Sequence, residues 1–276
     1  MNLRSNSFEK SKSDILDTSK KFMSLSTSSQ GFLFKWQKII DGDIYYYKTG
    51  EIIRKKIWNV QTFNEVICSR LGKEMGVNCV EYTLERTKIN RPDILLDSEI
   101  YVCKSKNFLD TSRSEQMYTF TKLLNTRRIG RDTDIYKLIL EKYPCIKESL
   151  DEMILFDFII NNEDRHLNNF GIIEDIEGNK RLTPLFDNGS SFCWSLEDYD
   201  IENSIGRLIN REDWSKPFRT HHKKQIKLID TSILDKYNFN IDIEKLFKGF
   251  EKLYSEQRLM LMKAMLKARL SYVRNM

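Results

Sequence analysis

Alternation of apolar and polar residues in the first third of the chain predicts a small antiparallel sheet. Residues 32–40 and 44–50 are rich in aromatic and β-branched side chains, and they flank the turn Asp41-Gly42-Asp43. Two such runs around a short turn are typical of a β-hairpin. Similar runs at 77–86 and 98–105 predict further strands.

Helical spacing of apolar residues prevails in the rest of the chain. One predicted helix includes Phe63, Val66, Ile67, Arg70 and Leu71 and ends near Gly72 or Gly76; the others lie at 114–125, 133–142, 147–161, 220–230, 241–250 and 255–274. Residues 170–186 instead predict a second hairpin, with its turn at 175–179. The pattern therefore predicts an α+β protein of two lobes.

The change of pattern also predicts the domain organisation. We expect a partly mobile N-terminal segment at 1–25, a sheet-rich lobe at 26–105 and a helical lobe at 106–276. A chain of 276 residues is long enough to bury a core in each lobe.

Composition excludes several classes of function. Lys and Arg number 45 against 40 Asp and Glu, so the formal net charge of +5 is a small excess on a mixed surface, and we expect no direct nucleic-acid binding. The longest apolar run, Met153–Ile160, has eight residues and contains Asp157, so we expect no membrane association. The polar N-terminus and the five scattered cysteines favour a reduced, cytoplasmic protein.

Candidate chemistry concentrates in two polar stretches, 161–171 and 183–191, on either side of the second hairpin. For any one of these residues alone, helix capping or turn formation is the more common explanation of an Asn or Asp. The set is more specific, because Asn169 precedes one strand of the hairpin and Asp187 follows the other. Antiparallel pairing returns Asp187 to the end where Asn169 and Asp164 lie. Such oxygen ligands suit a Mg²⁺ ion shared with nucleotide phosphates, which indicates phosphoryl transfer.

A phosphotransferase of this kind also needs a lysine for the nucleotide phosphates and a helix glutamate to hold it. Lys48 ends the alternation Ile44, Tyr46, Lys48 along one face of a predicted strand, and Glu65 lies on a helix face with small residues. An ordinary surface lysine and a solvated glutamate are the alternative interpretations of these two positions.

The spacing of the motifs resembles that of protein kinases, in which a catalytic Asp is followed five residues later by a metal-binding Asn and then by a further Asp. NNEDRHLNNFGII together with LTPLFDNGSSF is similar to the signature of the HipA-like serine/threonine kinases, and the DRHxxN core also resembles the phosphatidylinositol 3- and 4-kinases. The resemblance implies a two-lobed protein-kinase-like fold. It implies that Asp164 is the catalytic base, that Asn169 and Asp187 bind Mg²⁺, and that His166 lies near the phosphates.

The same resemblance extends over roughly residues 26–230. YYKTG followed by NEVICSRLGKEMG is similar to the lysine strand and helix of these kinases, which supports Lys48 and Glu65 as ATP-binding residues. Main-chain groups near Lys104, Ser105 and Lys106 would pair with adenine. Residues 28–35 resemble the form Ser-x-x-Gly-x-x-x-Lys, which makes Ser28 a candidate for autophosphorylation, with Ser24, Ser26 and Ser29 as alternatives.

The sequence therefore predicts an ATP- and Mg²⁺-dependent kinase that phosphorylates Ser or Thr on itself or on another protein. By resemblance, a toxin role and an antitoxin partner are open, although we expect the additional N-terminal domain of full-length HipA toxins to be missing. A lipid or small-molecule kinase is the alternative within the same fold. A nucleotide-binding scaffold without transfer activity is the alternative from another class.

Overall fold

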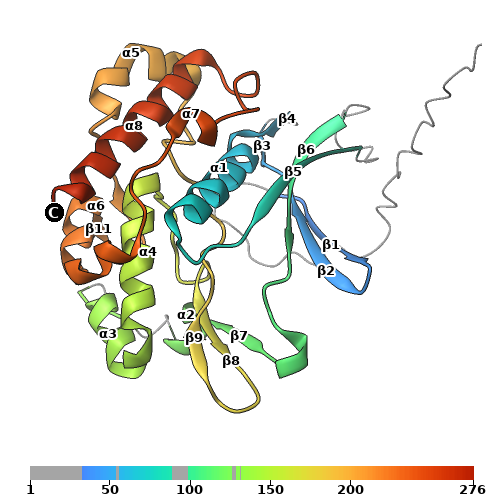
Figure 1. Cartoon of the computed structure of the whole chain (residues 1–276), viewed down its shortest axis with the longest axis vertical. Coiled ribbons are helices and arrows are strands. Elements are labelled where there is room, and N and C mark those ends of the chain that lie inside the picture. The colour runs from blue at the N-terminus through green and yellow to red at the C-terminus, as the bar shows by residue number, and fades with distance from the viewer. Residues whose placement is uncertain (1–32, 54–55, 89–98, 126–128, 131) are drawn as a thin grey trace, which may run out of the picture.

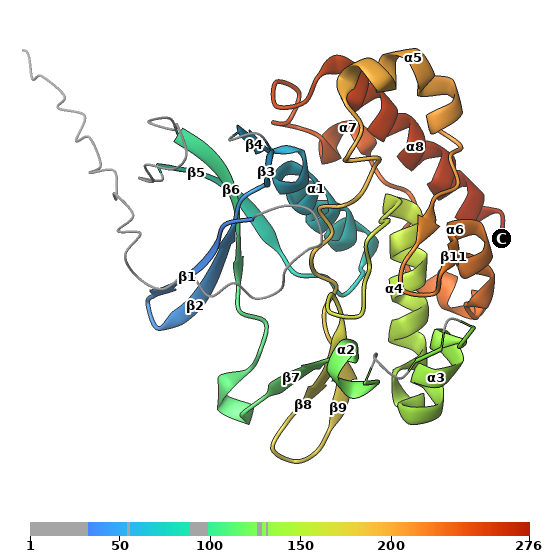
Figure 2. The same cartoon turned by 180° about the vertical axis from the view of Figure 1, so that it is seen from behind.

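The computed structural model describes residues 33–53, 56–88, 99–125, 129–130 and 132–276. A four-stranded sheet lies on one side of the molecule and a mainly helical body on the other, with one long helix between them (Figures 1 and 2). This arrangement confirms the predicted α+β fold. Ser28 and the neighbouring serines lie outside the described residues.

The first sheet is antiparallel, with the strand order β1-β2-β6-β5. Its strands span Lys35–Ile40 (β1), Asp43–Lys48 (β2), Tyr82–Lys88 (β5) and Glu99–Lys106 (β6). β1 and β2 form the predicted hairpin, in which Asp41 and Gly42 both have positive φ, 52° and 86°. Two such residues at the turn match the twist of the flanking strands. The register places Lys35 opposite Lys48 at the open end of the hairpin.

An additional short hairpin, which the pattern did not predict, leads from the first sheet into the helix α1. It consists of β3 (Glu51–Ile53) and β4 (Lys56–Trp58), and α1 spans Val60–Met75. Of the 16 residues of α1, 12 are buried, because the helix lies between the first sheet and the helical body (Figure 1). The helix ends at Gly76 in the left-handed conformation (φ 83°), as predicted.

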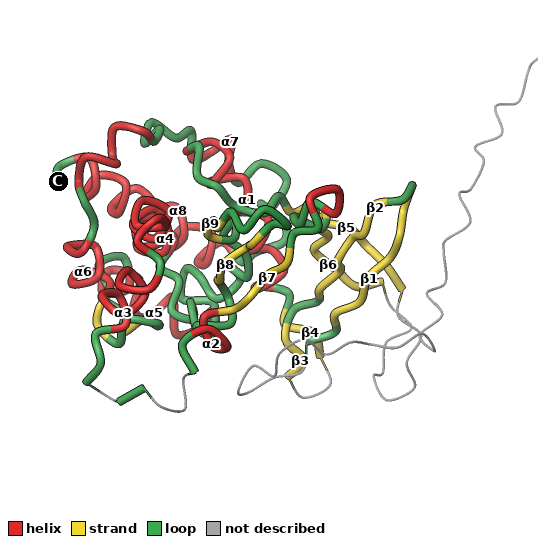
Figure 3. Tube along the Cα trace, turned by 90° about the horizontal axis from the view of Figure 1, so that it is seen from below, coloured by secondary structure: helices red, strands yellow, loops and turns green. Residues whose placement is uncertain are grey.

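Three strands form a second antiparallel sheet in the order β7-β8-β9. They span Gln116–Thr119 (β7), Gly171–Glu174 (β8) and Lys180–Leu182 (β9), and they lie between the first sheet and the helices α3 and α4 (Figure 3). The predicted hairpin 170–186 is present. The helix predicted at 114–125 is wrong over its first half, because Gln116–Thr119 pairs with β8 and only Phe120–Leu123 (α2) is helical. A long-range strand partner overrides the local helical spacing.

The helical body is built around α4 (Lys147–Ile160), in which 10 of 14 residues are buried. Helix α8 (Glu256–Arg274) packs beside it. The other helices are α3 (Ile135–Lys142), α5 (Asp198–Leu208), α6 (His222–Gln225) and α7 (Ile243–Leu246), and the strands β10 (Trp214–Ser215) and β11 (Thr220–His221) form a short hairpin. The pattern did not predict α5, which buries only two residues. Within the described ranges, no helix combines the length and the apolar character that crossing a membrane requires.

Asn64, in the middle of α1, connects this helix to the helical body. It is fully buried, and its side-chain amide donates to the carbonyl oxygens of Gly189 (3.1 Å) and Ser191 (2.8 Å). Its carbonyl oxygen accepts a hydrogen bond from the Tyr254 hydroxyl at 2.9 Å. This one side chain therefore attaches α1 both to the polar stretch after the second hairpin and to the segment before α8.

We expect Asn64→Ala to lower the free energy of unfolding by about 2–4 kcal/mol, because it leaves three buried polar groups without partners. Urea unfolding followed by circular dichroism measures this loss. Tyr254→Phe removes only one of the three hydrogen bonds and should cost about 1 kcal/mol. Equal stability of the Asn64→Ala variant and the wild-type protein would contradict the assignment.

Candidate functional site

The candidate site begins where α4 ends. Asn161 adopts the left-handed conformation (φ 53°), and the amide of Asn162 returns to the Asp157 carbonyl at 3.0 Å. The chain therefore leaves the helix abruptly and enters the loop 161–169. A main-chain hydrogen bond attaches this loop to the segment after β9, since the Glu163 amide donates to the Ser190 carbonyl at 3.2 Å.

Arg165 is the structural centre of this loop. Its guanidinium group is fully buried and forms a bidentate pair with the Asp157 carboxylate, at 2.8 and 2.9 Å. It also donates to the Phe186 carbonyl and to the Asn188 side chain. Burial disfavours the charged guanidinium, but the Asp157 carboxylate outweighs this effect and raises the pKa of Arg165. The charge of Arg165 thus links α4, the loop and the segment that contains Asp187.

The structure brings the residues of the predicted catalytic loop together by short main-chain contacts. The His166 amide donates to the Asp164 carbonyl and the Asn169 amide to the His166 carbonyl, both at 2.7 Å. The Asn169 side-chain amide donates to the Asp164 carbonyl at 3.0 Å. This bond engages the Asn169 nitrogen and leaves its carbonyl oxygen as the group suited to a cation.

Lys48 and Glu65 meet as the sequence predicted. The Lys48 ammonium lies 2.7 Å from a Glu65 carboxylate oxygen and also pairs with Asp187. The other Glu65 oxygen accepts the Asn188 amide at 2.8 Å. Glu65 is fully buried, so it is not the solvated glutamate of the alternative interpretation. This cluster joins β2, α1 and the segment after β9, although its residues are up to 139 positions apart in the chain.

The carboxylate of Asp187 has an unusual environment. Burial alone would raise its pKa, but the ammonium groups of Lys48 and Lys35 lower the pKa well below the ordinary value of an aspartate. Asp187 also has positive φ (59°), which aspartate tolerates better than most residues. The result is a fixed anion facing two cations, and its oxygen atoms are the ligand type that Mg²⁺ prefers.

Sequence reasoning did not single out Lys35 as a site residue. It lies at the start of β1, opposite Lys48, and its pKa is lowered by burial in spite of the attraction of Asp187. The signal was present, because Lys35 closes the Ser-x-x-Gly-x-x-x-Lys motif of residues 28–35. Arg165 was also given no role, although it lies inside the DRHxxN core.

The structure does not bring the side chains of Lys104 and Lys106 to this cluster. Lys104 pairs with Glu85 at 3.0 Å and Lys106 with Asp43 at 2.6 Å, both at the sheet surface. Cys103 is the β6 residue paired with Lys48. β6 nevertheless ends at Lys106 and leads directly into the link between the two regions, with the Asn107 amide bonded to the Ile44 carbonyl at 2.8 Å.

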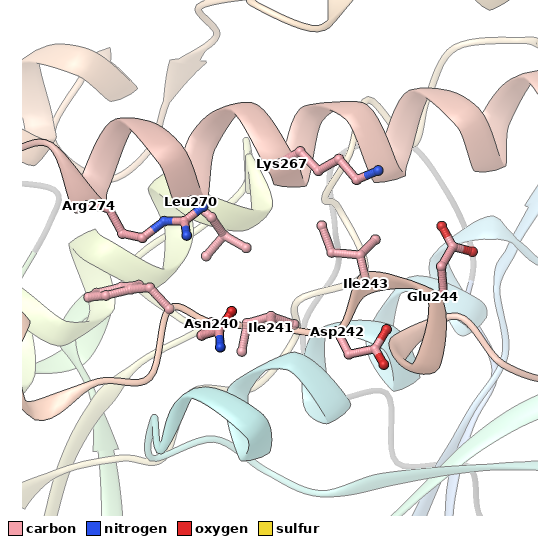
Figure 4. Close-up of a pocket in the computed structure, with 9 residues that line it drawn as sticks. Asn240, Ile241, Asp242, Ile243, Glu244, Lys267, Leu270 and Arg274 are labelled. Atoms are coloured by element: carbon pink, nitrogen blue, oxygen red, sulfur yellow. The ribbon is translucent and has the colours of Figure 1, made fainter.

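His166 lies near both carboxylates of the site. Burial lowers the pKa of its imidazole, while the charges of Asp164 and Asp187 act in the opposite direction. A separate hollow of about 310 Å³ lies between residues 239–244 and α8 (Figure 4). None of the candidate site residues lines that hollow, so we assign no role in the chemistry to it.

Both the sequence and the fold of the chain are similar to known proteins. The model of the HipA-like C-terminal domain family matches residues 27–238. The crystal structure of the Helicobacter pylori proinflammatory kinase CtkA aligns with a TM-score of 0.64 over 86% of this chain and 90% of that chain, at 18% identity. At this identity the likeness shows the fold, and it confirms the predicted kinase-like architecture. A comparison with curated proteins found no match.

Loss of the Arg165 charge should destabilise the whole protein. Arg165→Met leaves the Asp157 carboxylate buried without a cation, and we expect it to cost about 3–5 kcal/mol of unfolding free energy. Replacing both partners, as in Arg165→Met with Asp157→Leu, should restore part of that loss. Urea unfolding of the wild type and both variants measures the difference. If the single and double variants were equally stable, the pair would not hold the loop as described.

Glu163 should make stability depend on pH. Burial, together with the neighbouring Asp213, raises the pKa of this carboxyl group from 4.5 to about 7. The folded protein then binds the proton more tightly than the unfolded chain, so the contribution to stability is complete below pH 4.5 and is lost as the pH rises through 7. Glu163→Gln should therefore be more stable than the wild type at pH 8, with a difference that disappears toward pH 4.5.

Unfolding free energies measured between pH 4.5 and 8 check this expectation. Glu212→Gln serves as the control, because the exposed Glu212 pairs with Lys223 and its pKa is lowered. It should bring no gain at high pH. A Glu163→Gln profile parallel to that of the wild type would show that Glu163 does not titrate in this range.

Proposed function

Because the chain belongs to the HipA-like C-terminal domain family, we propose that it is a phosphotransferase, an ATP- and Mg²⁺-dependent serine/threonine protein kinase. The observation that supports this most directly is the contact of Lys48 with both Glu65 and Asp187. It joins an inner strand of the first sheet, the helix α1 and the polar segment after the second hairpin. A kinase needs these three parts together to hold the phosphates of ATP.

In this proposal, Lys48 binds the α- and β-phosphates and Glu65 holds its ammonium group in place. The Lys48 side chain is only 12% exposed and its ammonium group contacts two carboxylates, so it is already oriented before a nucleotide arrives. Lys35, which lies opposite it in the hairpin, adds a second positive charge to the phosphate side of the proposed site. The main chains of Lys104 and Ser105 pair with β2 and β5, so of the predicted residues Lys106, beyond the last β5 pair, is the proposed main-chain contact of adenine.

Asn169 and Asp187 are the proposed ligands of the metal. A carboxylate kept ionised by two lysines and an amide oxygen form a donor set that suits Mg²⁺ bound jointly with phosphate oxygens. When bound, Mg²⁺ neutralises charge that develops on the transferred phosphoryl group. The residues of this chain supply the fixed geometry, since Arg165 ties the Asn169 loop to the backbone around Asp187.

Asp164 is the proposed base. Its carboxylate is one-third exposed, so an acceptor hydroxyl can reach it from solvent. The hydroxyl oxygen attacks the γ-phosphorus, the bond to the β–γ bridging oxygen breaks, and the hydroxyl proton passes to Asp164. Because the transition state is loose, orientation of the hydroxyl matters more than a strong base. His166 lies beside the path of the phosphoryl group.

Autophosphorylation at Ser28 is a further proposal that rests on the motif of residues 28–35. Toxin activity and an antitoxin partner rest on the family alone, whereas the cytoplasmic location rests on the polar N-terminus and the scattered cysteines. The division at residues 26–105 and 106–276 remains the proposed arrangement of the kinase lobes. Transfer to a lipid or a small-molecule hydroxyl is the alternative within the same chemistry. A panel of protein and lipid acceptors distinguishes these substrates.

The test is transfer of labelled phosphate from ATP in the presence of Mg²⁺. We expect Asp164→Ala to lower the transfer rate by about 100-fold or more, because the group that receives the proton is lost. Asp187→Ala should lower it similarly and should also abolish Mg²⁺-dependent thermal stabilisation by ATP. Asp43→Ala, which removes an exposed carboxylate paired with Lys106, is the matched control and should transfer normally.

Equal label transfer by the wild type and by both site variants would refute the assignment of Asp164 and Asp187. Stabilisation by ATP without any transfer would instead identify a nucleotide-binding scaffold. Mass spectrometry of the purified protein for phosphoserine at residues 24–29 reports on autophosphorylation independently of an added acceptor.

A further inference from the structure

A lysine far from the catalytic motif lies against the proposed base. The Lys216 ammonium is 2.6 Å from a carboxylate oxygen of Asp164, which precedes it by 52 residues. Both side chains remain accessible, with exposed fractions of 52% for Lys216 and 33% for Asp164. An acceptor group that reaches Asp164 from solvent therefore also meets Lys216.

The backbone around Lys216 is attached to the catalytic loop. Lys216 and Asp164 form a parallel β-bridge, and the Lys216 amide contacts the Glu163 carbonyl at 3.5 Å. The buried Ser215 hydroxyl donates to the Asn162 carbonyl at 2.8 Å, and the Gln225 side chain donates to the Ser215 carbonyl at 2.9 Å. The backbone that carries Lys216 is thus fixed by hydrogen bonds to the catalytic loop and to α6, which limits the positions that its ammonium group can reach.

The other cations near the loop have different partners. Lys48 pairs with Glu65 and Asp187, and Arg165 pairs with Asp157. Both are buried or nearly buried, whereas Lys216 is exposed and contacts the residue that would receive the acceptor proton. The arrangement gives the two sides of the site separate positive charges, one for the nucleotide and one for the acceptor.

We propose that Lys216 is a catalytic residue of the transfer reaction, whose ammonium group contacts the phosphoryl group as it passes to the acceptor hydroxyl. The proposal rests on the proposed kinase function. The hydroxyl oxygen forms its bond to the γ-phosphorus, the electron pair of the broken bond stays on ADP, and the hydroxyl proton passes to Asp164. Lys216 keeps all of its protons and supplies charge only.

The physical need for such a cation is the repulsion between two anions. The Asp164 carboxylate and the γ-phosphoryl group must approach the same hydroxyl from opposite sides. A positive charge within about 4 Å of both reduces that repulsion, and at a partly exposed site we expect it to change the rate by about 10- to 100-fold. Ground-state binding of ATP depends on the Lys48 side of the site and should change little.

The experiment compares Lys216→Met, Lys216→Arg and Lys223→Met with the wild type. Lys223 is the matched control, because it also pairs with a carboxylate at 2.6 Å and is similarly exposed, with Glu212 as its partner. Steady-state kcat and KM for ATP are measured with a fixed protein acceptor and Mg²⁺. Thermal melting of each variant checks folding.

We expect Lys216→Met to lower kcat by about 10- to 100-fold while KM for ATP stays within about 3-fold. Lys216→Arg, which retains the charge, should recover most of the rate. Lys223→Met should behave like the wild type, and all melting temperatures should agree closely, because an exposed ion pair adds little stability.

Normal kcat in Lys216→Met would overturn the proposal while leaving the kinase function intact. An equal loss in Lys216→Met and Lys216→Arg with a lowered melting temperature would also overturn it, since the residue would then be structural. If the wild-type protein transfers no phosphate to any acceptor, the proposed function itself is refuted, and the role of Lys216 with it.

Discussion

The buried ion pair between Arg165 and Asp157 is the interaction on which the candidate site depends. Asp157 belongs to the last turn of α4, and Arg165 lies in the loop that follows, so the pair folds this loop back against the helix. The same guanidinium binds the Phe186 carbonyl and Asn188, which brings the segment after the second hairpin to the loop. A buried pair has a large desolvation cost, and it is stable here because further hydrogen bonds satisfy the guanidinium. This charge therefore holds the loop that contains Asp164 and Asn169 against the segment that contains Asp187.

A second set of contacts connects the first sheet to that loop region. Lys48 reaches Glu65 on α1 and Asp187 beyond β9, and Glu65 in turn accepts the Asn188 amide. Asn188 is therefore in contact with both clusters, through its backbone to Glu65 and through its side chain to Arg165. The nucleotide side and the metal side of the proposed site are coupled through one residue. A change that displaces the segment 186–188 would disturb both.

The charged residues of the site fall into a buried group and a partly exposed group. Lys48, Glu65, Asp157 and Arg165 are buried or nearly so, where low dielectric strengthens their interactions and fixes their geometry. Asp164 and Lys216 lie nearer to solvent, where an acceptor can reach them. This division is consistent with a site that holds one substrate rigidly and admits another. It also explains why a net charge of only +5 is compatible with a phosphate-binding site, because the decisive charges are few and local.

Local pattern alone determined the two hairpins, most of the long helices and the motif in which Asn169 follows Asp164 by five residues. These features depend on turn residues, on short periodicities and on the order of residues in one segment, all of which are visible in a single sequence. Even Lys48 and Glu65 could be predicted from the sequence, since each lies on a recognisable strand or helix. The tertiary structure decided what depends on residues far apart in the chain. It turned residues 116–119 into a strand through pairing with β8, gave Arg165 its partners and brought Lys216 to Asp164. No local pattern specifies such contacts, because they form only when the packed core brings separate segments of the backbone together.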